Sequence, residues 1–249
     1  MSGHSKWSTI KRQKGVADAR RGQLFTKLGR EVALAVRDGG SDPDMNPRLR
    51  LAVQKARDQN MPLENIERAI KKASGGEEGS SLSEATFEGY GPGGVAILLE
   101  TLTDNRNRTL QEIRSILTKG GGSLGEAGCV SWLFELKGII VIESADADTE
   151  EMALAAIDAG AEDMKVEKGY LEIYTRPEDL TQVRGALEDA GLQVTSAESV
   201  MMPNTTVELD ESSTIQILKL IDRLEGMDDV QRVFSNAEFS DSALQQYQF

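Results

Sequence analysis

The hydrophobic positions of the first 75 residues recur with a helical period. Between residues 24 and 36, apolar side chains follow one another at spacings of three and four, and two glycines at 39–40 end this stripe. An Asn-Pro pair at 46–47 and a Met-Pro pair at 61–62 each open a further segment with apolar residues on one side. The pattern therefore predicts three short amphipathic helices that form a small bundle.

A second pattern begins after residues 74–83 (SGGEEGSSLS), whose Gly, Ser and Glu content is typical of a linker. Residues 95–102 (VAILLETL) are strand-like, and residues 108–119 carry a helical stripe. The apolar and aromatic runs at 129–136 and 138–142 predict two further strands, with Cys129 as a small core residue in the first.

From Gly138 onward, the order of the predicted elements is strand, helix, strand, strand, helix, strand. This is the order of the ferredoxin-like, split βαβ arrangement. A Lys-Gly pair at 168–169 suits a tight hairpin between the two middle strands. The elements are expected at residues 138–142, 149–159, 164–167, 170–175, 177–190 and 193–197.

The last predicted elements, at 207–209, 213–224 and 230–234, can complete the sheet that begins near Phe87. The ferredoxin-like unit is then an insertion. We therefore expect an α+β protein, with an N-terminal three-helix domain followed by two α/β domains, one ferredoxin-like and inserted in the other. The predicted bounds are 1–74 for the basic helical domain, 84–136 plus 204–240 for the discontinuous α/β domain, and 137–203 for the inserted domain.

Charge is divided unequally along the chain. The whole chain has a net charge of −13, yet residues 1–72 contain 16 Lys and Arg against 8 Asp and Glu, a net of +8. The remaining 12 basic and 33 acidic residues give a net of −21. Such asymmetry indicates a basic contact surface on an acidic body, of which only one end is attracted to a polyanion.

The basic positions near the N-terminus are interleaved with Trp7 and small residues. Arg favours bidentate phosphate contacts and Lys is a mobile point charge, while Trp7 can stack on a base or anchor the arm to the bundle. A solvated helix face is the alternative, and the contrast with the acidic remainder favours polyanion contact. The predicted nucleic-acid-binding residues are Lys6, Trp7, Lys11, Arg12, Lys14, Arg20, Arg21, Lys27 and Arg30.

A second candidate anion contact lies at residues 103–109 (TDNRNRT), between a predicted strand and a predicted helix. Asp104 or Asn105 can cap the helix, and Arg106 and Arg108 can then point at an anion near its N-terminus. Capping alone accounts for the Asp and the Asn, whereas two arginines in a very acidic region are harder to explain structurally. By contrast, the glycine run at 91–94 precedes a strand, which favours a turn over a phosphate loop.

Residues suited to catalysis are few. The one histidine, His4, lies close to the terminus, and no histidine lies near Cys129 in the sequence to activate it. The HExxH, CxxC, GxSxG and Walker patterns do not occur. We therefore expect no enzyme activity, no metal and no cofactor. A single cysteine, together with the lack of a signal peptide and of a membrane-spanning apolar run, predicts a cytoplasmic protein without a membrane partner.

Three segments of the chain resemble the YebC/PmpR family. They are residues 1–32 (MSGHSKWSTIKRQKGVADARRGQLFTKLGREV), 61–75 (MPLENIERAIKKASG) and 88–109 (EGYGPGGVAILLETLTDNRNRT). The match is ordered and extends over essentially the whole chain. It implies an N-terminal helical domain and two α/β domains, one inserted in the other.

For function, the resemblance implies a bacterial regulator of transcription that binds DNA. It also implies an alternative, because related proteins, including a mitochondrial translational activator of cytochrome c oxidase, act on ribosomes and are proposed to relieve stalling. Both functions predict a basic N-terminal domain, so the charge pattern does not separate DNA from ribosomal RNA as the partner. The sequence indicates no particular oligomeric state.

Overall fold

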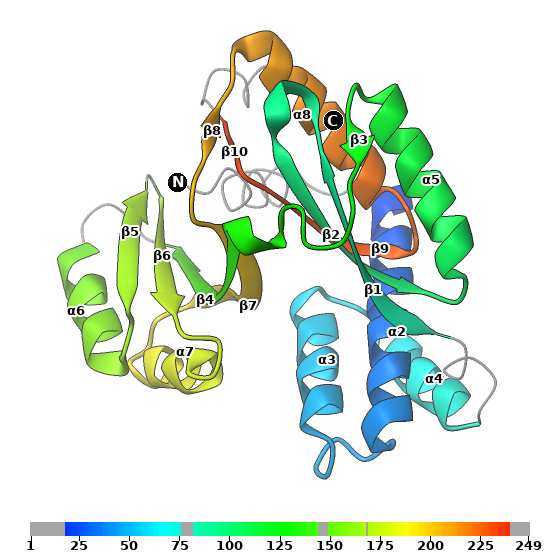
Figure 1. Ribbon diagram of the computed structural model, residues 1–249. Coiled ribbons are helices and arrows are strands. Elements are labelled where there is room, and N and C mark those ends of the chain that lie inside the picture. Colours follow the sequence, from blue (N-terminus) through cyan, green and yellow to red (C-terminus); the bar gives the residue numbers. More distant parts are fainter. Residues whose placement is uncertain (1–17, 76–81, 144–148, 168, 240–249) are drawn as a thin grey trace. The chain divides into compact units, whose positions relative to one another are not determined.

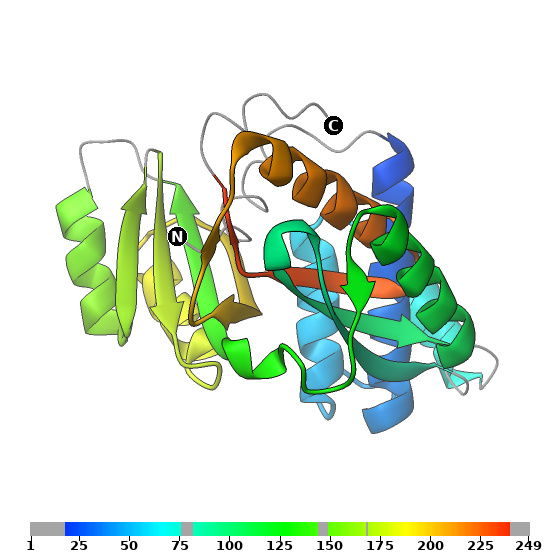
Figure 2. The same ribbon diagram turned by 45° about the horizontal axis from the view of Figure 1, so that its top comes forward.

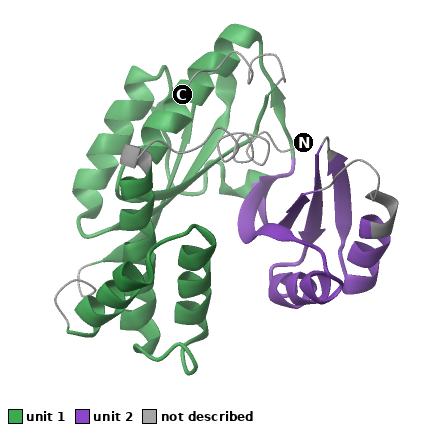
Figure 3. Ribbon diagram, turned by 180° about the vertical axis from the view of Figure 1, so that it is seen from behind, with its two compact units in different colours: residues 1–133, 205–249 green, residues 134–204 purple. Residues whose placement is uncertain are grey.

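The computed structural model describes residues 18–75, 82–143, 149–167 and 169–239. The chain divides into two compact units, one comprising residues 1–133 and 205–249 and the other residues 134–204 (Figure 3). N-terminal helices are followed by mixed helices and antiparallel strands, which confirms the predicted α+β class.

Among the described residues, the N-terminal bundle of the larger unit contains three helices (Figure 1). They are α2 (Asp18–Gly39), α3 (Pro47–Asp58) and α4 (Leu63–Ser74). As the Asn-Pro pair predicts, Asn46 is the N-cap of α3, and its side chain accepts a hydrogen bond from the backbone N–H of Leu49 at 3.0 Å. The Asn46 amide also donates to the carbonyl oxygens of Ala35 and Gly40 at 2.7 and 2.8 Å. One side chain thus begins α3 and fixes the end of α2.

The larger unit also contains an antiparallel sheet with two helices on one face (Figure 2). Its elements are β1 (Ser83–Tyr90), β2 (Ala96–Thr103), α5 (Arg106–Lys119), β3 (Ser123–Leu124), α8 (Glu211–Glu225) and β9 (Val230–Ser235), and the sheet order is β3-β1-β2-β9. Ile97, Leu99 and Val233 from the sheet pack in one buried cluster with Ile113 of α5 and Ile217 of α8. A strand that begins at Val230 therefore completes a sheet whose first strand begins at Ser83.

Short elements complete this unit. The glycine run forms a turn between β1 and β2, as its position before a strand predicts, and Gly93 and Gly94 have φ of 72° and 75°. Only glycine adopts such left-handed conformations readily, so the turn depends on these residues. The short elements are η1 (Pro92–Gly94), η2 (Ser131–Leu133), β8 (Val207–Glu208) and β10 (Ala237–Glu238), the last two paired in parallel.

The smaller unit has the predicted ferredoxin-like fold. Its elements are β4 (Phe134–Glu143), α6 (Thr149–Ala159), β5 (Asp163–Glu167), β6 (Tyr170–Thr175), α7 (Leu180–Asp189) and β7 (Val194–Pro203). The sheet order is β5-β6-β4-β7, and every neighbouring pair is antiparallel. Strand β6 therefore lies between β4 and β5, as a split βαβ unit requires. Ile140 and Ile173 of the sheet pack against Val183 and Leu187 of α7.

The prediction of a strand at 129–136 was wrong for its first part. Residues 131–133 form the 3-10 turn η2, and Cys129 lies half-buried in the loop before it rather than in a strand core. The carboxylate of Glu88 accepts hydrogen bonds from the backbone N–H groups of Gly128, Val130 and Ser131 at 2.7, 2.7 and 2.8 Å. These groups are consequently engaged outside any strand ladder.

The predicted break between two strands at residue 137 was also wrong, because β4 runs through this position. Gly138 is paired in register with Thr175 of β6. A Cβ atom at this position would collide with Thr175 Oγ1. The glycine therefore permits close packing within the sheet and does not end the strand.

Candidate nucleic-acid interface

The predicted nucleic-acid-binding residues lie partly within the described structure. Arg21, Lys27 and Arg30 lie along α2, where Arg21 is exposed and the other two are partly buried. Arg20 also belongs to α2, although its side chain is outside the described part. The remaining predicted residues, Lys6, Trp7, Lys11, Arg12 and Lys14, lie outside the described residues.

Lys27 and Arg30 contact the turn between α8 and β9. The Lys27 ammonium donates to the carbonyl oxygen of Glu225 at 2.5 Å. The Arg30 guanidinium donates to the carbonyl oxygen of Asp228 at 3.0 Å and to the carboxylate of Asp229 at 2.7 Å. Because α8 ends at Glu225, these cations lie where a helix presents unpaired carbonyl groups and partial negative charge. Both residues thus attach α2 to the C-terminal part of the same unit.

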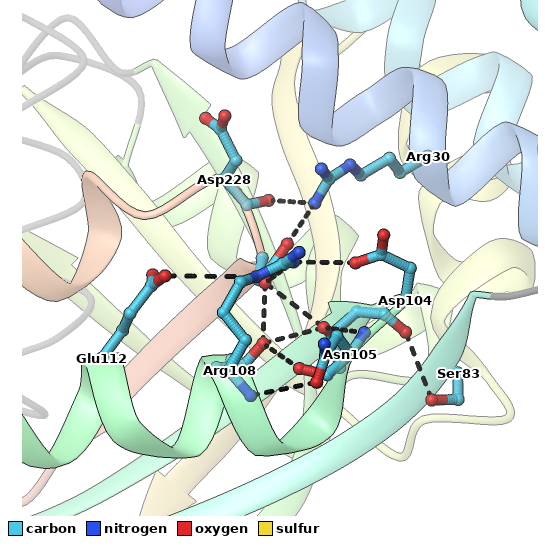
Figure 4. A network of polar contacts seen from close by, with 10 residues as sticks. Arg30, Ser83, Asp104, Asn105, Arg108, Glu112 and Asp228 are labelled. Carbon is cyan, nitrogen blue, oxygen red and sulfur yellow. Dashed lines mark hydrogen bonds and ion pairs between the residues drawn. The ribbon is translucent and has the colours of Figure 1, made fainter.

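Asp229 is the centre of this contact and pairs with Arg30 and Arg108, whose guanidinium groups point toward the same place (Figure 4). Its side chain is 6% exposed and pairs with Arg30 through one oxygen. The other oxygen accepts hydrogen bonds from Arg108 at 2.7 Å, Thr109 at 2.7 Å and Thr103 at 3.2 Å. Burial on its own would raise the pKa of Asp229, but the hydrogen bonds from Arg108, Thr109 and Arg30 outweigh it and lower the pKa to about 2. The carboxylate is therefore held ionised as a structural anchor.

The two arginines of the TDNRNRT segment have different surroundings. Asn105 is the N-cap of α5, and its side chain accepts a hydrogen bond from the backbone N–H of Arg108 at 3.1 Å. The Arg108 guanidinium bonds Asp229 and also Asp104, at 2.7 Å, and these carboxylates raise the pKa of Arg108. The anions that Arg108 contacts are thus the carboxylates of Asp104 and Asp229 in the same chain. Arg106 is exposed, with its guanidinium 5.8 Å from the ring centre of Phe87.

Helix α4 carries an exposed basic face that the sequence analysis missed. Arg68, Lys71 and Lys72 are all exposed, on the side of the helix opposite the buried Ile66 and Ala73. Their spacing of three and four residues was the available signal, because such positions are neighbours on one helix face. Arg68 makes a long hydrogen bond, 3.4 Å, to the amide oxygen of Asn65 in the preceding turn of the helix. We call Arg68, Lys71 and Lys72 the α4 basic face.

A pocket of about 550 Å³ lies between α2 and α4. Its wall is formed by small residues of α2, apolar side chains and the cations Arg30, Arg68 and Lys72. The carboxylate residue Asp104 also lines it. The residues that line it are Gly22, Phe25, Thr26, Gly29, Arg30, Ala33, Met61, Asn65, Arg68, Ala69, Lys72, Leu82 and Asp104. Its volume lies in the range of roughly 300–1,000 Å³ that is usual for ligand sites.

Two features of the described residues concern metal binding and the chemistry of the cysteine. Within them, no group of three or more His, Cys, Asp and Glu side chains is placed to hold a metal ion. Burial and the nearby Glu88 carboxylate raise the pKa of the Cys129 thiol, which lowers its thiolate fraction and its reactivity. No helix among the described residues combines the length and apolar character needed to cross a membrane.

Comparison with known proteins identifies the family. The model of the TACO1/YebC protein N-terminal domain matches residues 5–76, and that of the TACO1/YebC second and third domain matches residues 82–237. The chain belongs to the TACO1/YebC family.

Relatives in this family match nearly the whole chain. A probable transcriptional regulatory protein, cbdbA400, of Dehalococcoides mccartyi is 56% identical over 247 residues, which cover 99% of this chain and 98% of the relative. Another protein of this description, from Desulfosudis oleivorans, is 52% identical, with 97% of this chain and 98% of the relative covered. The crystal structure of a conserved hypothetical protein, Aq1575, of Aquifex aeolicus matches with a TM-score of 0.81 and 47% identity, covering 90% of this chain and 93% of that one. The names of the relatives support a regulator at the level of the family.

Proposed function

We propose that this chain is a non-enzymatic transcriptional regulator of the cytoplasm that binds DNA through its basic N-terminal helical domain. The observation that carries the proposal is the division of charge, +8 in residues 1–72 against −21 in the remainder. Within the helical domain, the α4 basic face supplies three exposed cations on one side of a helix. The relatives are named probable transcriptional regulatory proteins, which supports a regulatory role for binding through this basic domain.

The proposed interface combines the α4 basic face with cations of the N-terminal segment. Lys6, Lys11, Arg12, Lys14, Arg20 and Arg21 supply charge from that segment, with Trp7 available for stacking. Lys27 and Arg30 contribute indirectly, because they hold α2 on the α8–β9 turn. Phosphate contacts of this kind position a protein without reading base sequence. If six to ten phosphates are involved, affinity should fall about 10³- to 10⁵-fold between about 50 and 200 mM salt.

Ribosomal RNA offers the same phosphate chemistry, and a ribosome-associated factor that relieves stalling is the alternative function. Sedimentation of the untagged protein from a gentle lysate at low salt, with and without DNase, separates the two. The expected result is absence from ribosomes, with association that DNase removes or retention on promoter fragments over random DNA. Co-migration with ribosomes that survives DNase would overturn the transcriptional proposal and favour the alternative.

A further inference from the structure

The pocket between α2 and α4 has the chemistry of a nucleotide site. Phe25, Met61 and Leu82 give it apolar walls, while Arg68 and Lys72 bring positive charge to it from α4. A nucleotide combines a flat, weakly polar base with an anionic phosphate. The apolar walls suit the base, and the two cations suit the phosphate. Asp104 does not leave an unbalanced negative charge at the pocket, because its carboxylate pairs with Arg108 at 2.7 Å.

The glycines of α2 are a second, independent observation. Gly22 and Gly29 lie seven residues apart on the helix face that lines the pocket. A Cβ atom added at either position would meet no atom of the described residues within 4 Å, so packing among these residues does not require glycine there. Glycine within a helix destabilises it relative to alanine. The presence of glycine at both positions of the pocket wall is explained if a molecule bound in the pocket lies close to the backbone of α2.

The facing side of α4 has the matching spacing. Asn65, Arg68, Ala69 and Lys72 lie at intervals of three and four residues, and all line the pocket. Asn65 adds an amide that donates and accepts hydrogen bonds, as base edges require. The two helix faces thus present a small-residue wall opposite a polar, basic wall.

We infer that this pocket receives one unpaired nucleotide of a bound nucleic acid, with its base against the apolar wall and its phosphate at Arg68 and Lys72. The inference rests on the proposed nucleic-acid binding and adds a preference to it. A nucleic acid with an unstacked base should bind more tightly than a fully paired duplex, because stacking and burial of one base are worth about 1–3 kcal/mol, or roughly 5- to 150-fold.

The test uses full-length protein, a short paired DNA duplex and the same duplex with one unpaired adenosine. The variant Gly29→Leu fills the pocket from α2, and Gly185→Leu is its matched control. Gly185 lies within α7 of the other unit, and a Cβ atom there also meets no described atom within 4 Å. Both substitutions replace a helical glycine by a better helix former, so the melting temperature of each variant should equal or exceed that of the wild type.

Wild type and Gly185→Leu should bind the bulged duplex about tenfold more tightly than the paired one. Gly29→Leu should bind the paired duplex normally and lose the preference. Equal affinity of the wild type for both duplexes, or a preference that survives Gly29→Leu, would overturn the inference while leaving the proposed function in place. Failure of the wild type to bind either duplex would overturn both. If Gly29→Leu melts below the wild type, Asn65→Ala decides the question, since it removes a polar group from the pocket and should reduce the preference.

Discussion

The helical bundle contains two sets of cations with opposite surroundings. Lys27 and Arg30 of α2 point into the larger unit and bond the α8–β9 turn. Arg68 and Lys71 of α4 are exposed. The comparison shows that cations of one basic domain can either bond to other parts of the fold or lie exposed, and that this depends on their neighbours in the folded chain. We expect the inward set to control stability and the outward set, with the N-terminal segment, to control binding.

The largest effect should come from neutralising the N-terminal cations. Changing Lys11, Arg12, Lys14, Arg20 and Arg21 together to glutamine should abolish binding to nucleic acid. These cations are expected to supply phosphate contacts, which account for essentially all of sequence-independent affinity. Fluorescence anisotropy measures the binding, and circular dichroism checks the fold. A variant that binds normally would mean that these cations form only a solvated surface.

The inward set is tested at Asp229. Replacing Asp229 by Asn should destabilise the protein by about 1–3 kcal/mol, because two arginines and two threonine hydroxyls lose a buried charged acceptor. Chemical denaturation measures the change. Asp228→Asn is the matched control, since it makes the same charge change at an exposed neighbour whose side chain points away from the network (Figure 4). An equal loss in both variants would contradict the anchoring role of Asp229.

The same carboxylate predicts a pH dependence. Folding lowers the pKa of Asp229 from 3.8 to about 2, so the unfolded chain binds this proton more readily than the folded chain does. The stability contributed by Asp229 is therefore complete above about pH 4 and is lost as the pH falls toward 2. Denaturation at stepped pH should show a steeper acid loss in the wild type than in Asp229→Asn. Parallel curves would exclude this contribution.

A smaller effect is expected at the α4 basic face. Arg68→Gln with Lys71→Gln should weaken binding roughly tenfold and lower the salt slope by about two, with no loss of stability. Arg114→Gln with Lys119→Gln makes the same charge change on exposed positions of α5 and should leave binding nearly unchanged. Equal weakening by both pairs would show that net charge, and not a localised face, governs the affinity.

The smallest effect is expected at Arg106. Its guanidinium is exposed above Phe87, and such a contact contributes only about 0.5–1 kcal/mol. Arg106→Gln should therefore lower stability by less than about 1 kcal/mol and leave the salt slope unchanged. A fall in the slope by about one would instead assign Arg106 a phosphate contact.

Local patterns were sufficient to predict the class of the fold. The apolar spacing between residues 24 and 36, the Asn46 cap and the element order after Gly138 each express a short-range rule, and the structure contains the corresponding elements. The errors around Cys129 and Gly138 have long-range causes. The Glu88 carboxylate accepts hydrogen bonds from backbone N–H groups about 40 residues later in the chain. The side chain of Thr175 leaves no room for a side chain at position 138.

The candidate site was less predictable than the fold. Nothing local distinguishes Lys27 from Lys71, because the partner of Lys27 is the Glu225 carbonyl, 198 residues later. The pairing of Arg108 with Asp229 is similarly distant in sequence. The α4 basic face, by contrast, was visible as three cations on one side of a predicted helix. To predict the pocket, one would have to know how α2 packs against α4, and no local pattern in the sequence indicates this.

Lysine footprinting in the presence and absence of DNA tests the central claim most directly. Acetylation of the native protein, read by mass spectrometry, reports the accessibility of each lysine. We predict that DNA protects Lys71 of α4 and Lys11 and Lys14 of the N-terminal segment, while Lys119 of α5 and Lys219 of α8, both exposed, react equally in both states. Protection of Lys119 and Lys219 with unchanged reactivity at Lys11, Lys14 and Lys71 would place the interface elsewhere and contradict the account.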